Sequence, residues 1–494
     1  MNRQEEQLLT KNSESCQTQQ PQQQNRNKNE MDMTSGNLAK KILLFSLPII
    51  FSSLLQLLYN AADLIVCGEF GSEHSVGAIS ATNSLINLII QLFLGLSVGA
   101  NVLMARCYGS KQQQKGQRVV YTAMILSVVV GVFLGAFGAV FARYFLVWMG
   151  TPDELISLST TYLTIYFCGV PFSLVYNFGA SLLRAVGDTK RPFYFLAISG
   201  IFNVLFNLLF VIVFKMDVAG VALGTILSQA ISAGCVVVCL LKNKGFFHFS
   251  LKELKFYKKE ALEIARIGLP AGLQGAIFSL SNVLIQSSVN SLGTNTVDGN
   301  GAACSIEGFV YVTMNSVAQA CIAFVSANFG ARKWENIKKC LRYCVGYVCL
   351  FGITVGVIVT LLGKVLLSIY LPKNPEAIEI GYTRLVIICL TYFTCGLMDT
   401  FAYSLRGIGY SLLPTIVSLC GACGSRILWI YTVFLLEPFH SLQGLAISYP
   451  ISWVLTASTH FMLFAILFAK KCNANELLQS QRVESVKTDG AQKI

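Results

Sequence analysis

Hydrophobic residues occur along the chain in long runs separated by short polar stretches. Each run is long enough to cross a hydrocarbon core of about 30 Å as a helix rising about 1.5 Å per residue. Twelve runs are predicted, near 39–66, 77–105, 119–147, 156–182, 192–214, 218–241, 261–291, 301–327, 340–370, 377–405, 410–436 and 444–469. The pattern predicts an all-α integral membrane protein with no separate soluble domain.

Composition supports this interpretation. Of the 494 residues, 54% are hydrophobic and 13% are charged, whereas charged residues make up about 25% of a typical soluble protein. Most of the surface is therefore expected to face lipid.

The basic residues predict the orientation. Lys and Arg cluster after the second, fourth, sixth and eighth runs, while the odd connections "CGEFGSEHS" and "SLGTNTVDGN" contain none. The positive-inside rule then places both termini in the cytoplasm. The net charge of +12 is largely this topology signal, so no nucleic-acid partner is expected.

The two ends differ from the hydrophobic body of the chain. Residues 1–36 are rich in Gln and Asn and have no apolar segment of the kind found in secretory signals. This composition predicts a disordered cytoplasmic tail. Residues 471–494 predict a second, shorter cytoplasmic tail of the same kind.

The two halves of the body repeat each other. "SLPIIF" in the first run answers "GLPAGL" in the seventh, and "LLRAVGDTKRPF" answers "SLRGIGYSLLPT"; Pro48 and Pro270 are 222 residues apart. The repeat predicts homologous six-helix bundles at 37–241 and 261–470, joined by a basic cytoplasmic linker at 242–260. Because each bundle has an even number of spans, the repeats are parallel, which suits alternating access.

On these features the chain resembles the multidrug and toxic compound extrusion (MATE) transporters over roughly residues 38–470. The motifs are "LPIIFSSLLQLLYNAADLIVCGEFG", "LLRAVGDTKRP", "IEGFVYVTMNSVAQACIAFVSANFGARKWENIKK" and "SLRGIG", in that order along the chain. The resemblance implies export of organic, often cationic amphipathic compounds, driven by entry of sodium or protons.

Two departures from the family pattern concern the coupling ion. The sodium-driven bacterial branch of the family carries a Glu in the middle of the seventh span, where this chain has only Gln274. Many members with an acidic first span have Asn and, four residues later, Asp in the fifth span, where this chain has Asn203 and Asn207. The negative charge of the first bundle is therefore concentrated on Asp63.

Asp63 and three polar residues are predicted to share one depth. Counting from helix ends at about 1.5 Å per residue places Asp63, Asn207 and Thr225 about 9 to 12 Å below the outer face, with Asn203 one turn below Asn207. The resemblance implies a cation site at these positions, and their oxygens are hard donors. The same residues could instead hold a protonated Asp63, or form a polar knot that only joins the helices.

Three further charges lie deep in the second bundle: Glu307, Asp399 and Arg426. Because an unpaired charge in a membrane is costly, Arg426 is predicted to pair with one of the two acids, with Asp399 preferred over Glu307. Arg406 lies near a helix end and is expected to snorkel or pack in a loop.

A cleft between the bundles is predicted to hold the substrate, lined by aromatic and polar side chains. The candidates are Tyr59, Tyr176, Gln274, Phe309 and Tyr392. Pro48 and Pro270 are predicted to bend their helices.

The leading hypothesis is a monomeric secondary active antiporter in the plasma membrane that needs no cofactor beyond a proton or sodium gradient. No phosphate-binding loop is found, and no metal is expected beyond the transported cation, if that is sodium. One alternative is a flippase for lipid-linked precursors, which would call for several cationic residues in the cavity. The other is a membrane-embedded lipid-modifying enzyme, for which no metal-diphosphate or zinc motif is present in the spans.

Overall fold

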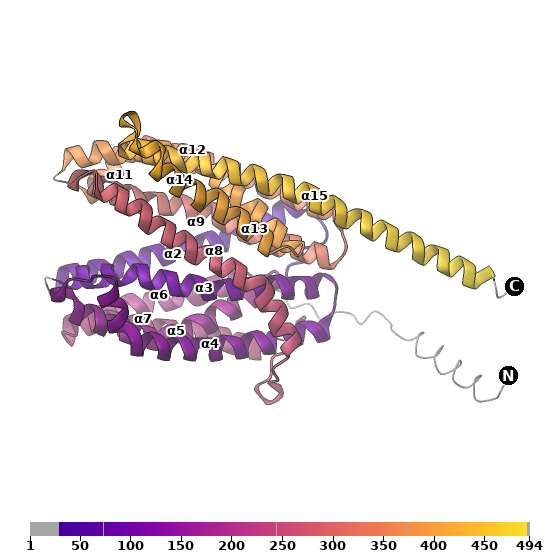
Figure 1. Ribbon diagram of the computed structural model, residues 1–494. Helices are drawn as coiled ribbons and strands as arrows, with labels where there is room; N and C mark the ends of the chain where they lie inside the picture. Colours follow the sequence, from indigo (N-terminus) through magenta and orange to yellow (C-terminus); the bar gives the residue numbers. More distant parts are fainter. Residues whose placement is uncertain (1–28, 73, 244, 373, 492–494) are drawn as a thin grey trace.

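The computed structural model describes residues 29–491 apart from 73, 244 and 373, and all regular structure in them is helical. Twelve helices or helical runs among these residues are long and apolar enough to cross a membrane. The predicted fold class is therefore confirmed. The chain folds into two helical layers that lie one above the other in the view of Figure 1.

The first bundle contains six spans, and the fifth of them ends in a π-helical turn, η1. Its elements are α2 (Leu38–Phe70), α3 (Ser75–Gly109), α4 (Gln113–Trp148), α5 (Asp153–Ala185), α6 (Lys190–Leu208), η1 (Leu209–Val213) and α7 (Asp217–Leu241). A linker with one 3₁₀ turn, η2 (Leu251–Glu253), leads to the second bundle.

The second bundle also contains six spans, and more of its spans are divided into shorter helical elements. Its elements are α8 (Lys258–Asn290), α9 (Thr294–Gly330), α10 (Trp334–Leu361), α11 (Gly363–Tyr370), α12 (Pro375–Gly407), α13 (Leu412–Ser418), η3 (Leu419–Gly424), α14 (Ser425–Tyr431), η4 (Val433–Leu435), η5 (Glu437–Phe439) and α15 (Leu442–Ala491).

Three boundaries differ from the predicted ones. The run 340–370 is divided at Leu362 between α10 and the short α11. The run 410–436 is assembled from α13, the π-helical turn η3 and α14. The expected disorder at 471–494 was wrong as far as Ala491, because α15 continues to that residue.

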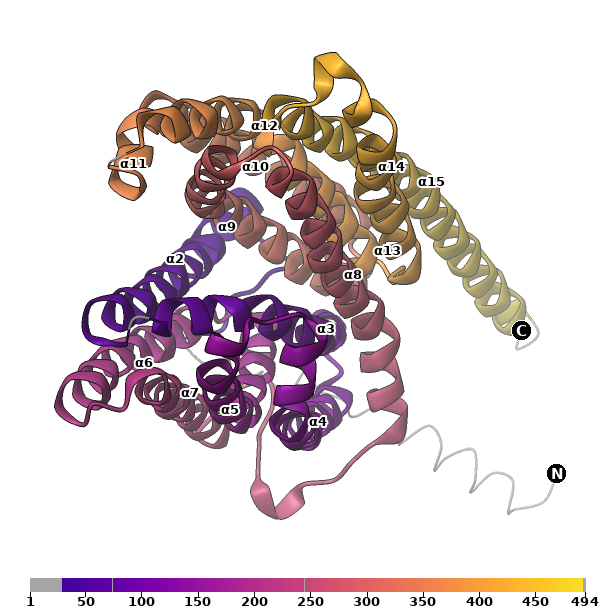
Figure 2. The ribbon, with the colours of Figure 1, turned by 60° about the vertical axis from the view of Figure 1, so that its left-hand side comes forward.

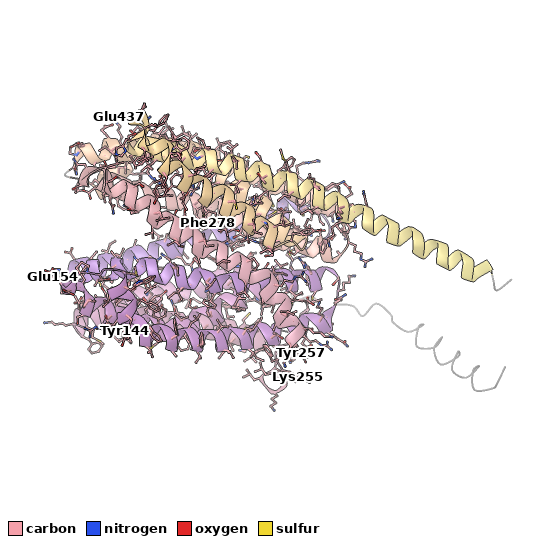
Figure 3. All side chains as sticks on the ribbon, in the orientation of Figure 1. Tyr144, Glu154, Lys255, Tyr257, Phe278 and Glu437 are labelled. Atoms are coloured by element: carbon pink, nitrogen blue, oxygen red, sulfur yellow. The ribbon has the colours of Figure 1, made fainter. Side chains whose placement is uncertain are left out.

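One end of the molecule carries residues 109–115, 242–260 and 330–342, and we call it the basic end. Lys255 and Tyr257 lie at this end, whereas Glu154 and Glu437 lie at the opposite end (Figure 3). The start of α2 and the C-terminal part of α15 also belong to the basic end (Figure 1).

The bundles meet through two helix pairs, and the repeat relates one pair to the other. α3 packs on α8, and α2 packs on α9 (Figure 2). At the crossing of α3 and α8, a Cβ on Gly95 would lie 2.1 Å from the Gly272 backbone nitrogen. At the basic end, a Cβ on Gly109 would lie 1.8 Å from the Ala327 carbonyl oxygen. The basic ends of the two bundles are therefore in backbone contact.

We expect Gly95→Ala to destabilise the protein by roughly 1–3 kcal/mol, because the added methyl meets backbone atoms that can move only if the helices separate. Gly301→Ala in α9 is the matched control, since no atom lies within 4 Å of a Cβ at that position. Thermal unfolding of the purified variants measures the difference. A Gly95→Ala variant at least as stable as the Gly301→Ala variant would contradict this account of the crossing.

Part of the N-terminal segment predicted as a disordered tail is packed against the basic end. Met33 is fully buried, and its carbonyl accepts a hydrogen bond from Asn328 Nδ2 at 2.8 Å. The Thr34 carbonyl accepts from Lys333 Nζ at 2.7 Å. The prediction of disorder was therefore wrong for residues 30–36; residues 1–28, the first part of the predicted tail, lie outside the described residues, which begin at residue 29.

Candidate functional site: a buried carboxylate cluster and a charged second bundle

Asp63 lies inside α2, where its side chain faces α6 and α7. It is 9% exposed, and its Oδ1 accepts a hydrogen bond from Asn207 Nδ2 at 2.5 Å. Its Oδ2 accepts a longer bond from the Thr225 hydroxyl at 3.5 Å. One carboxylate thus joins three helices of the first bundle.

Asn203 completes the cluster. It lies one turn before Asn207 on α6, and its Oδ1 accepts a bond from Asn207 Nδ2 at 3.5 Å. Its own Nδ2 donates to Thr225 Oγ1 at 3.5 Å. The structure therefore brings Asp63, Asn203, Asn207 and Thr225 together, as helix periodicity predicted, whereas their use as a cation site stays a prediction.

The cluster has two properties that suit a cation. Among residues 29–491 as described, Asp63 makes no ion pair with a basic side chain. The Oδ1 atom of Asn207 is buried and has no hydrogen-bond donor. A buried carboxylate bound only by neutral donors, next to an amide oxygen without a donor, favours a proton or a hard cation. The π-helical turn η1 begins two residues after this asparagine, and such turns often occur at functional positions.

In the second bundle, Glu307 is paired with Arg384, a residue that the sequence analysis missed. Arg384 Nε and Nη2 donate to the two carboxylate oxygens of Glu307 at 3.0 and 2.9 Å. The two side chains are only 6% and 4% exposed. Arg384 lies nine residues into α12, about 14 Å along the helix, so its depth was a signal that could have identified it.

Among the described residues Arg426 pairs with no acid, so the predicted ion pair with Asp399 or Glu307 was wrong. Its Nε donates to Ser452 Oγ at 2.9 Å, and its guanidinium lies 4.2 Å from the centre of the Tyr449 ring. A hydrogen bond and a cation–π contact stabilise this buried charge. Asp399 instead accepts from Asn315 Nδ2 at 3.4 Å.

Arg406 is 4% exposed, so the expectation that it snorkels or packs in a loop was wrong. Its Nη2 donates to Gln274 Oε1 at 2.6 Å, which joins α12 to α8. Gln274 is therefore held by a buried arginine. The predicted role of Gln274 in the substrate cleft stays a prediction.

The aromatic candidates divide between the bundles. Tyr59 packs beside Gly200 on α6 and donates to the Ala197 carbonyl at 3.4 Å. Tyr176 is buried in the first bundle, where its hydroxyl donates to the Pro192 carbonyl at 3.0 Å. Both side chains therefore contact residues of the first bundle, and their place in a substrate cleft stays a prediction.

Phe309 and Tyr392 are half-buried in the second bundle. The Tyr392 ring stacks on Trp453 with 5.0 Å between centroids. The Tyr392 ring also contacts Tyr311, with 6.2 Å between centroids. Tyr311 lies close to Asp399, because Asn315 hydrogen-bonds both the Tyr311 hydroxyl and Asp399, and Tyr392 and Trp453 extend the row of rings from Tyr311.

Pro48 lies inside α2 and Pro270 inside α8, and both helices continue through them. Ser52 Oγ donates to the Pro48 carbonyl at 2.7 Å, and Thr415 Oγ1 donates to the Pro270 carbonyl at 3.1 Å. The predicted bending at these residues stays a prediction.

Comparison with known proteins agrees with this architecture. The MatE family model matches residues 48–209 and 270–432, so its two matches begin at the prolines that the repeat equates. YoeA of Bacillus subtilis (strain 168), a probable multidrug resistance protein, is 26% identical over 437 residues, which cover 87% of this chain and 94% of YoeA. YpnP of the same organism, also a probable multidrug resistance protein, is 28% identical over 389 residues, which cover 78% of this chain and 86% of YpnP.

A solved outward-facing structure of a multidrug resistance MATE family transporter of the MOP superfamily shares the fold. Its TM-score is 0.83 at 20% identity, and the match covers 90% of this chain and 99% of that chain. The two repeated bundles of membrane-spanning helices, together with the family match, place the chain among multi-pass membrane transporters. The chain belongs to the MATE family of multidrug efflux transporters.

Proposed function

We propose that the protein is a secondary active antiporter that exports organic, cationic amphipathic compounds in exchange for protons or sodium. The observation that carries the proposal is the buried Asp63 carboxylate, bound only by neutral groups of α6 and α7. A transported cation, or a proton, would neutralise it without help from a fixed basic residue.

In this mechanism the charge on Asp63 controls how α2 packs. With the carboxylate neutralised, the contacts to Asn207 and Thr225 hold α2 against α6 and α7. When the carboxylate is charged and empty, its burial is unfavourable, which favours movement of α2 toward water. Pro48 removes one backbone hydrogen bond from the same helix and is the place where we expect it to bend. The cation thereby biases a two-state helix, as coupling requires.

The substrate side of the proposal rests on the second bundle. Tyr311 shares Asn315 with the Asp399 carboxylate, and the Tyr392 and Trp453 rings continue the aromatic row from Tyr311. Aromatic faces and a carboxylate both attract an organic cation. The flippase alternative is weaker, because the charge of Arg384 is neutralised by Glu307 and Arg406 is bound to an amide.

Dye efflux from cells that lack their own efflux pumps tests the proposal. We expect efflux to stop when one cation gradient, proton or sodium, is collapsed and to continue when only the other is collapsed. Efflux that persists with both gradients collapsed would exclude cation-coupled antiport. The proposal needs no cofactor and no second protein chain.

We further propose that the protein lies in the plasma membrane with the basic end and both termini in the cytoplasm. In a cysteine-free chain, a single cysteine introduced as Ser250→Cys, in the linker, is expected to react with an impermeant maleimide only after the membrane is permeabilised. The positive-inside rule is the physical reason. Labelling from outside intact cells would show that the linker faces the outside and would contradict the proposed topology.

A further inference from the structure

A cavity of about 780 Å³ opens at the basic end between the two bundles. Two loops from equivalent positions of the repeat form it: Lys111 follows α3 in the first bundle, and Arg332 follows α9 in the second. Both residues have left-handed backbone conformations, with φ of 58° and 55°. The cavity therefore lies on the seam that must separate when the basic ends open, and we call it the basic-end pocket.

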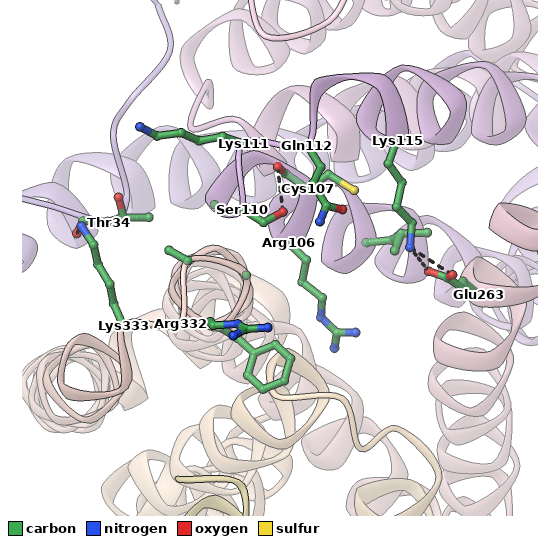
Figure 4. A pocket seen from close by; sticks show the side chains of 15 residues that line it. Thr34, Arg106, Cys107, Ser110, Lys111, Gln112, Lys115, Glu263, Arg332 and Lys333 are labelled. Atoms are coloured by element: carbon green, nitrogen blue, oxygen red, sulfur yellow. Dashed lines mark hydrogen bonds and ion pairs between the residues drawn. The ribbon is translucent and has the colours of Figure 1, made fainter. Parts of the chain in front are cut away.

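The charge of the basic-end pocket is strongly positive. Five cationic side chains line it, together with the carboxylate of Glu263; the cations are Arg106, Lys111, Lys115, Arg332 and Lys333. Figure 4 shows the pair between Lys115 and Glu263 at one edge of the pocket, with Lys333 and Thr34 at the other. The pair is 2.9 Å long, so four of the cations have no carboxylate partner among the residues that the structure describes.

Helix termini do not account for this charge. The Ser110 amide donates to the Arg106 carbonyl, and the Ala331 amide donates to the Ala327 carbonyl, both at 2.9 Å. Main-chain amides thus already donate to carbonyls in the last turns of both helices, so the cations are not needed as donors to those carbonyls. Within the described part of the chain, the exposed side chains of Lys111 and Arg332 make no hydrogen bond or ion pair.

One polar atom in the pocket lacks a partner. Arg106 Nη2 donates to the carbonyls of Arg406 and Gly407 at 2.9 and 3.1 Å, which fixes the guanidinium across the two bundles. The Nε atom of the same side chain is buried and has no acceptor. The accessible groups are the side chains of Lys111 and Arg332, one from each bundle on either side of this fixed arginine, and an anion with several oxygens would provide acceptors for both.

We propose that the basic-end pocket binds a phosphate-bearing anion, either a lipid headgroup or a free phosphate compound. The volume is that of a small-molecule site, and guanidinium and ammonium groups are the usual partners of phosphate oxygens. Because the anion contacts both bundles at once, it binds only while the basic ends are together. By linkage, its binding then holds them together and slows the transport cycle.

Binding to the purified full-length chain tests the site without any transport measurement, so failure of the antiport proposal would leave the result valid. In nanodiscs of phosphatidylcholine alone, the probe is inorganic pyrophosphate, measured by calorimetric titration. In a second arm, the nanodiscs contain phosphatidic acid, and thermal unfolding is the readout. The pocket variant is Lys111→Gln with Arg332→Gln; the matched control is Lys339→Gln with Arg342→Gln, two exposed cations of α10 outside the pocket.

We expect the wild type and the control to bind at least one of the two probes, and the pocket variant to bind it at least about tenfold more weakly. Binding of pyrophosphate alone identifies a free phosphate compound, and stabilisation by phosphatidic acid alone identifies a headgroup. No binding to the wild type, or equal binding by the pocket variant, would overturn the proposal.

Spin labels at Gln113→Cys and Glu335→Cys, on the first turns of α4 and α10, test the conformational part. The bound probe is expected to raise the population with the shorter distance between the labels. An unchanged distance distribution under saturating probe would show that the anion binds without holding the bundles together.

Discussion

Asp63→Asn is expected to abolish cation-driven efflux while leaving expression and folding close to those of the wild type. The asparagine has the shape of the aspartate and keeps an oxygen acceptor for Asn207 Nδ2. In the wild type this nitrogen lies 2.5 Å from Asp63 Oδ1. The amide of the introduced asparagine can donate to the Thr225 hydroxyl, which now donates to Oδ2. Only the charge is lost, and with it the ability to take up and release a proton or sodium ion.

Efflux of a fluorescent cation from cells that lack other pumps measures this prediction, with expression and thermal unfolding measured on the same variant. Asp153→Asn is the matched control, because it makes the same chemical change at an exposed position of the same bundle and should pump normally. If Asp63→Asn pumps at the wild-type rate with unchanged ion dependence, Asp63 is only structural. The coupling would then have to reside in Glu307 or Asp399.

Arg384→Met is expected to destabilise the protein by about 3–5 kcal/mol, because it leaves the buried Glu307 carboxylate without its bidentate partner. The double variant Glu307→Gln with Arg384→Met should recover most of this loss, since neither remaining side chain is charged. Arg426→Met is a useful comparison: it removes one hydrogen bond and two ring contacts but leaves no unpaired acid. Its loss should therefore be smaller.

Thermal unfolding of the single and double variants forms a double-mutant cycle. A strongly favourable coupling between Glu307 and Arg384 is expected. Additive losses, or a double variant as unstable as Arg384→Met, would show that the ion pair is not what makes the substitution harmful.

Helix periodicity, depth and the family resemblance together predicted the Asp63 cluster from sequence. Asn203 and Asn207 are four residues apart and so share a face of α6, and counting from the helix ends places Asp63 and Thr225 at the same level. The family resemblance supplied the remaining information, which helices are neighbours. The buried carboxylate and its amide partners are also rare enough in an apolar chain to be recognised.

The second bundle could not be predicted in the same way. Depth alone does not say which helices are adjacent, so Arg426 was predicted to pair with Asp399 or Glu307. In the structure Glu307 pairs with Arg384, and Asp399 accepts a hydrogen bond from Asn315. The packed N-terminal segment was missed for a different reason. The average composition of residues 1–36 is polar, which predicted disorder. Residues 30–36 are nevertheless ordered, because Met33 is buried and Asn328 and Lys333 donate to the backbone carbonyls of Met33 and Thr34.

Cation movement driven by substrate in purified proteoliposomes tests antiport through Asp63 most directly. A substrate gradient is imposed with no cation gradient present, and internal pH and sodium are recorded with fluorescent indicators. The account predicts an opposite flux of protons or of sodium in the wild type, which stops when the substrate gradient is exhausted, and none in Asp63→Asn. Substrate flux without cation movement in the wild type, or equal cation flux in Asp63→Asn, would contradict it.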